Sequence, residues 1–128
     1  MPESRQLQIA APPGWPDQIP APGRDGWQDK AITWLYEQLD PGWRDHDDLW
    51  QRDPRLLARL VRHTAQAQIE ELRRGYSTVR VDLPDIEPHT RDELLAVYAT
   101  EGERTKHLMR QAQLVADALQ GVRWRPGR

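Results

Sequence analysis

The 128-residue chain contains no cysteine, which excludes disulfides, thiol catalysis and cysteine-ligated zinc. Phenylalanine is also absent, and lysine occurs only as Lys30 and Lys106. This usage often reflects a GC-rich genome rather than a function. No apolar run reaches the roughly 18 residues that a transmembrane helix needs. The sequence therefore predicts no membrane partner.

Charge of one sign is also lacking, because the formal net charge is −2 and the pI is about 6.1. This balance argues against a general nucleic-acid coat or a polybasic membrane binder. The residues from Met1 to Arg5 show no basic-then-apolar signal pattern. The expected location is the cytoplasm, and the length fits one domain with a substantial core.

The prolines divide the chain. Residues 1–24 are predicted to form an irregular Pro-rich arm, because Pro12, Pro13, Pro16, Pro20 and Pro22 prevent a helix there. We expect this arm to hold Trp15 against the helices, and the alternative is a polyproline segment for a partner's groove. Residues 25–121 are predicted to form a single helical domain, and residues 122–128 a basic tail.

A first helix is predicted over residues 25–39. Asp25 is the expected N-cap, and the sequence Asp40-Pro41-Gly42 ends the helix. One further helical turn is expected around residues 47–51. The apolar spacing places one group of residues on a single face: Trp27, Ala31, Trp34, Leu35 and Gln38.

Two longer helices are predicted over Pro54–Leu83 and Thr90–Gln120. The first begins at Asp53-Pro54, a capping carboxylate followed by proline. Gly75 is an ordinary stop signal, and a strand through residues 79–83 is the competing interpretation. We favour a continuous helix, because an apolar stripe with coiled-coil spacing passes Gly75: Leu57, Val61, Ala65, Ile69, Leu72, Tyr76, Val79, Leu83 and Ile86.

The second long helix follows a turn between Pro84 and Pro88. Thr90 and Glu93 have the spacing of a capping box, and Gly121 is the expected C-terminal cap. The resulting fold is all-α, an antiparallel hairpin that a second copy would complete as a dimeric bundle. The expected dimer seam is Leu94, Tyr98, Glu101, Thr105, Leu108, Ala112, Val115 and Leu119.

Catalytic and metal-binding motifs are weak. The cluster from Asp45 to Asp48 matches no calcium loop and is interpreted as a solvated turn. No two histidines have the spacing of metal ligands on one helix face. No cofactor, metal site or catalytic residue is predicted, and an enzyme is not favoured. A small enzyme or ligand-binding bundle that uses His63, Tyr98, Glu101 or this cluster is one alternative.

Arginines gather at the open end of the predicted hairpin. An antiparallel pair returns the basic tail beside the start of the first long helix, with Trp124 and Trp50 interleaved. Such a surface suits an acidic protein or nucleic acid, so a nucleic-acid-associated regulator is a further alternative. The leading hypothesis is a non-enzymatic helical interaction or accessory protein that self-associates or binds another protein. The candidate contact residues are Arg52, Arg55, Arg59, Arg62, Arg123, Trp124 and Arg125.

Overall fold

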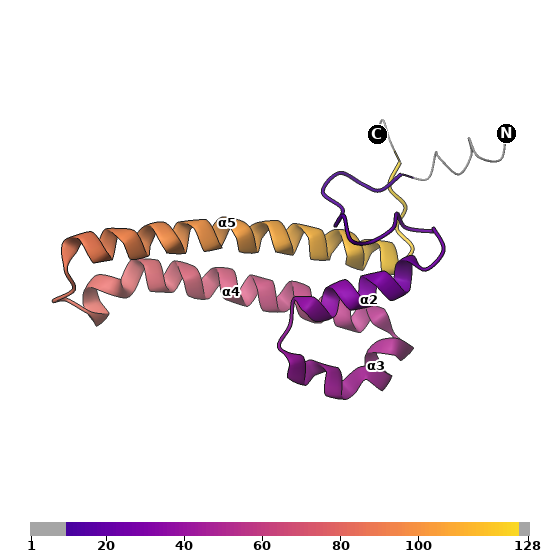
Figure 1. Cartoon of the computed structure of the whole chain (residues 1–128), viewed down its shortest axis with the longest axis horizontal. Helices are drawn as coiled ribbons and strands as arrows, with labels where there is room; N and C mark the ends of the chain where they lie inside the picture. The colour runs from indigo at the N-terminus through magenta and orange to yellow at the C-terminus, as the bar shows by residue number, and fades with distance from the viewer. Residues whose placement is uncertain (1–9, 126–128) are drawn as a thin grey trace. The chain divides into compact units, whose positions relative to one another are not determined.

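A computed structural model describes residues 10–125, which are helical with connecting turns and contain no strand. Two long helices pack against each other (Figure 1). Within the described residues the chain forms two compact units, residues 10–62 with 110–125, and residues 63–109. The elements are α2 (Trp27–Glu37), η1 (Pro41–His46), α3 (Asp47–Arg52), α4 (Pro54–Asp82) and α5 (Pro88–Leu119).

The first unit begins with a series of tight turns in residues 10–26. Backbone hydrogen bonds from Trp15 N to Pro12 O (3.0 Å) and from Ile19 N to Pro16 O (3.1 Å) close two of them. The Trp15 indole N–H donates to Ile19 O at 2.9 Å. Trp15 and Ile19 are both buried. The turns therefore contribute side chains to the core of this unit.

Helix α2 begins later than predicted. Its N-cap is Gly26, with φ of 77°, and not Asp25. The left-handed backbone at this point strongly favours glycine, because a Cβ is strained there. The predicted inner face is confirmed in part, since Ala31, Trp34 and Leu35 are buried.

The segment between α2 and α4 contains more helix than the single turn predicted. Pro41 begins the 3₁₀ helix η1, and α3 follows directly. Trp50 of α3 is buried and donates its indole N–H to Trp43 O at 2.8 Å. The two rings lie 6.5 Å apart. Trp50 therefore belongs to the core and is not an exposed aromatic beside the arginines, as the sequence had suggested.

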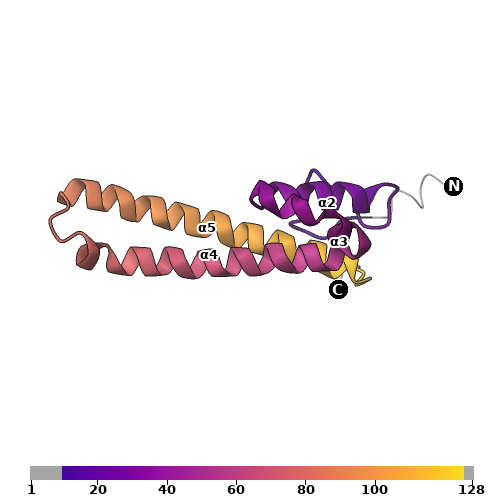
Figure 2. The same ribbon diagram turned by 90° about the horizontal axis from the view of Figure 1, so that it is seen from below.

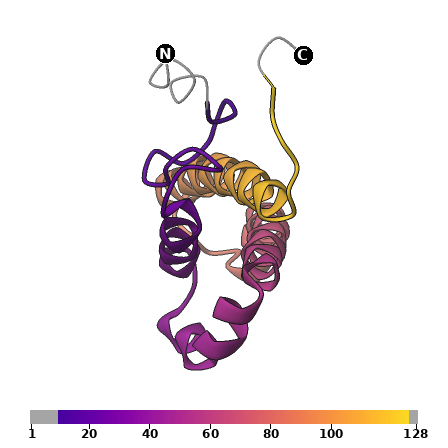
Figure 3. The ribbon, with the colours of Figure 1, turned by 90° about the vertical axis from the view of Figure 1, so that its right-hand side faces the viewer.

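Three helical segments enclose the core of the first unit. Figure 3 shows α2, the start of α4 and the end of α5 around a common interior. Several of the fully buried side chains are alanines, whose small size allows helices to approach closely, while larger side chains fill the interior. In the parts of these helices that belong to the first unit, the side chains with 0% or 1% exposure are Ala31, Leu35, Leu57, Ala58, Val61, Ala112 and Val115.

The second unit, residues 63–109, consists of the parts of α4 and α5 on either side of the turn that joins them (Figure 2). Helix α4 continues through Gly75, which confirms the continuous helix and excludes the strand alternative. Gly75 is needed because the Tyr98 ring lies across it. A Cβ at position 75 would be 2.9 Å from Tyr98 Cζ and Oη. The glycine that resembled a stop signal is therefore a contact point between the helices.

The cap of α5 differs from the prediction. The helix begins at Pro88 rather than Thr90. Glu87 is the capping side chain, because its carboxylate accepts hydrogen bonds from the backbone N–H groups of His89 (2.9 Å) and Thr90 (2.8 Å). These bonds lower the pKa of Glu87. Glu93 does not reach back to Thr90 but pairs with His89 at 2.9 Å.

We expect the effect of Gly75→Ala to change sign with the residue at position 98. Beside Tyr98 the added methyl group displaces the ring, so the substitution should destabilise the protein by about 1 kcal/mol. In a Tyr98→Ala background that overlap is absent, and alanine should stabilise the helix by about 1 kcal/mol. Urea unfolding of all four members of this double-mutant cycle measures the coupling. Equal effects in both backgrounds would show that the contact does not constrain position 75.

Candidate functional site

Four of the arginines that the sequence singles out lie at the junction of α3 and α4, with Arg52 at the end of α3 and the other three in α4. Two of the four have partners described below. Arg55 makes two hydrogen bonds of 2.7 Å to the Asp53 carboxylate, and this contact lowers the pKa of Asp53. Arg62 Nη1 donates to Gln113 Oε1 at 2.8 Å. Arg52, Arg55 and Arg59 are exposed, and Arg62 is of intermediate exposure. A contiguous basic stripe is thus broken by internal pairing.

The C-terminal basic residues lie beside a different part of the first unit from the one predicted. Arg123 and Trp124 line a groove with Pro12, Pro22 and Trp27, and no residue of α4 lines this groove. The sequence analysis expected the tail beside Arg52 and Arg55, neither of which lines this groove. Arg125 is exposed.

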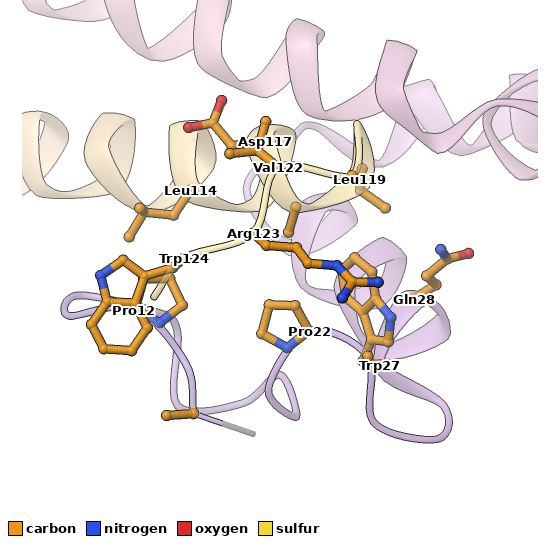
Figure 4. Close-up of a pocket in the computed structure, with 14 residues that line it drawn as sticks. Pro12, Pro22, Trp27, Gln28, Leu114, Asp117, Leu119, Val122, Arg123 and Trp124 are labelled. Atoms are coloured by element: carbon orange, nitrogen blue, oxygen red, sulfur yellow. The ribbon is translucent and has the colours of Figure 1, made fainter. Parts of the chain in front are cut away.

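The end of α5 directs the tail into this groove. Gly121 has φ of 84°, and hydrogen bonds run from Val122 N to Asp117 O (2.9 Å) and from Gly121 N to Ala118 O (3.0 Å). These two bonds define a Schellman motif, which confirms Gly121 as the C-terminal cap. Figure 4 shows the Arg123 side chain extending toward Trp27 and the Trp124 indole beside Pro12.

The groove has a volume of about 750 Å³. A polar minority in its lining consists of Gln28, Asp117 and Arg123, and the rest is mainly apolar. No periodicity in the sequence indicates this site, because eight of its fourteen lining residues lie outside the helices. The lining residues are Ala10, Pro12, Pro22, Gly23, Trp27, Gln28, Leu114, Asp117, Ala118, Leu119, Gly121, Val122, Arg123 and Trp124.

The predicted dimer seam on α5 is partly used within the single chain. Thr105, Ala112 and Val115 are buried, so they are not accessible to a second copy in this conformation. The Thr105 hydroxyl donates to Glu101 O at 2.8 Å, which satisfies its polar atom inside the helix. The five remaining positions are of intermediate exposure: Leu94, Tyr98, Glu101, Leu108 and Leu119.

Apolar side chains remain exposed on the second unit. Within residues 63–109, all of which the structure describes, only Ala65, Ile69, Val79 and Thr105 are buried. Tyr76 continues the inner stripe of α4 and is nonetheless 51% exposed. Two helices alone cannot enclose a core, so their facing stripes stay open along both edges. The large exposed apolar residues here are Tyr76, Val81, Leu83 and Val97.

Two of the side chains considered for catalysis, Asp47 and Glu101, have structural partners. The Tyr36 hydroxyl donates to Asp47 Oδ1, and burial together with this bond raises the Tyr36 pKa to about 12. The hydroxyl therefore stays protonated at neutral pH. Glu101 pairs with Arg104 at 3.0 Å. Across residues 10–125 no cluster of three acidic or histidine side chains is arranged to hold a metal ion.

The chain matches no protein-family model, no curated protein and no solved structure. No helix in the described part of the chain combines the length and the apolar character required to span a membrane. The candidate sites are accordingly defined by their geometry alone: the open stripes of the hairpin in residues 63–109 and the groove at the end of α5.

Proposed function

We propose that this protein is a non-enzymatic helical interaction protein that self-associates through the hairpin of residues 63–109. The observation that carries this proposal is the half-exposed apolar stripe of that hairpin, where Tyr76 is 51% and Leu83 is 53% exposed. Exposed apolar side chains that follow one helix stripe are typical of a surface that packs against another helix.

A second copy is the partner that this stripe fits best. Two antiparallel hairpins that bury their stripes against each other form a four-helix bundle, the arrangement that supplies the interior a two-helix hairpin lacks. The contact is isologous, so one surface serves both copies. Nucleic acid fits this unit poorly, because residues 63–109 carry nine acidic against six Lys and Arg side chains.

The mass of the protein in solution tests this proposal. At tens of micromolar we expect sedimentation equilibrium to give twice the 14.9 kDa of one chain. Tyr76→Glu should shift the protein to monomer, because it puts a charge in the apolar contact. The matched control is Val81→Glu on the same helix. Val81 is 78% exposed and five residues farther on, which places it on the opposite side of α4.

Both variants should retain the helical circular dichroism of the parent, because each replaces a side chain that is more than half exposed. A parent protein that stays monomeric at these concentrations would contradict the proposal. Equal weakening of the dimer by Tyr76→Glu and Val81→Glu would also contradict it, since a contact through the inner stripe requires Tyr76→Glu to have the larger effect.

A further inference from the structure

We propose that the groove beside the C-terminal end of α5 binds a small amphipathic ligand, which has a planar apolar body and a single anionic group. This site is independent of the hairpin surface, because every residue that lines it belongs to the unit of residues 10–62 and 110–125. Its volume of about 750 Å³ lies in the range of small-molecule pockets.

Unused hydrogen-bond donors indicate the anionic group. Within residues 10–125, Arg123 makes no ion pair or hydrogen bond, and the indole N–H groups of Trp27 and Trp124 have no acceptor. The buried Trp15 and Trp50 behave differently, since each donates to a backbone carbonyl. The groove thus brings together three solvent-accessible donors, because Arg123 and Trp124 are exposed and Trp27 is of intermediate exposure. A carboxylate or sulfonate would provide acceptors for them.

Flat apolar walls indicate the planar body. The rings of Trp27, Trp124, Pro12 and Pro22 line the groove. Trp27 is held in place by Trp15, whose ring lies 6.2 Å away. Stacking on aromatic faces favours a planar ligand, and a guanidinium next to an indole suits an aromatic anion.

The groove's own charge limits the ligand to one negative group. Asp117 is the only carboxylate in the lining, and its Oδ1 already accepts a hydrogen bond from Gln113 Nε2 at 2.8 Å. A single cation opposite a fixed carboxylate leaves little net positive charge. Polyanions such as nucleic acids need several cations and are not expected to bind here.

A pair of matched probes tests the site in the full-length protein. The fluorescent 8-anilinonaphthalene-1-sulfonate carries the anionic group, and N-phenyl-1-naphthylamine shares its ring system without the charge. We expect both to bind at one site per chain. Arg123→Gln should weaken the sulfonate by about tenfold or more, because it removes a charge-assisted contact. The neutral probe should be unaffected.

Two further variants complete the test. Trp124→Ala should weaken both probes, because it removes a wall of the groove. Arg125→Gln is the control, since this exposed neighbour does not line the groove and should change neither affinity. Failure of the sulfonate to saturate at one site would overturn the proposal. Equal effects of Arg123→Gln and Arg125→Gln on the sulfonate would also overturn it. They would show that Arg123 acts only through the general charge of the surface and not through a contact with the ligand.

Discussion

Replacing Trp15 with alanine is expected to lower the free energy of unfolding by about 3–5 kcal/mol. Trp15 is only 8% exposed, packs 6.2 Å from the Trp27 ring and donates its indole N–H to Ile19 O. Alanine leaves a cavity where the indole was and a carbonyl without its donor. Because Trp15 packs the turns of residues 10–26 into the unit, the effect should be much larger than is usual for a loop residue.

Urea unfolding followed by circular dichroism measures this change. Trp124→Ala is the matched control, because it removes the same side chain from a site that is 39% exposed and where the indole has no acceptor in the described chain. The control should cost much less than Trp15→Ala. Similar midpoints for the two variants would show that the turn segment does not depend on Trp15.

The second large effect is expected at Leu57. This side chain is 0% exposed and lies in the first turn of α4. Leu57→Ala should cost about 2–5 kcal/mol, which combines the lost transfer free energy with the cavity that remains. In a protein of this size such a loss is a large part of the total stability.

The adjacent leucine provides the control. Leu56 is 40% exposed, so Leu56→Ala makes the same chemical change in the same helical turn and should cost no more than about 1 kcal/mol. Thermal unfolding of the two variants compares them directly. If both melted at the same temperature, the assignment of Leu57 to the inner face of α4 would be contradicted.

The long helices are predictable because their signals are local and repeated. Over thirty residues the apolar spacing in α4 outweighs one glycine, so the passage through Gly75 can be inferred from the stripe. The start of α4 is marked equally well by Asp53-Pro54, and the C-terminal end of α5 by Gly121. The start of α5 is not marked in this way, because the side chains of Glu87 and Thr90 both offer an oxygen to the free backbone N–H groups. Only the three-dimensional path selects Glu87.

The side-chain partners of the arginines cannot be predicted from the helical spacing of the sequence. Arg55 and Arg62 occupy exposed helical spacing in the sequence, yet one pairs with Asp53 and the other with Gln113, 51 residues away. The groove is even harder to predict from the sequence. It depends on the direction in which the Schellman motif sends Arg123 and on turns that have no period.

The contact between Gly75 and Tyr98 sets the register of the hairpin. A heptad stripe is nearly self-similar, so sliding one helix by seven residues, about 10.5 Å, would again place apolar positions opposite each other. Gly75 is the only glycine in α4, and Tyr98 the only tyrosine in α5. Their close fit exists in one alignment alone. After such a slip the ring would meet a residue with a Cβ, so this pair selects one alignment from a repeating series.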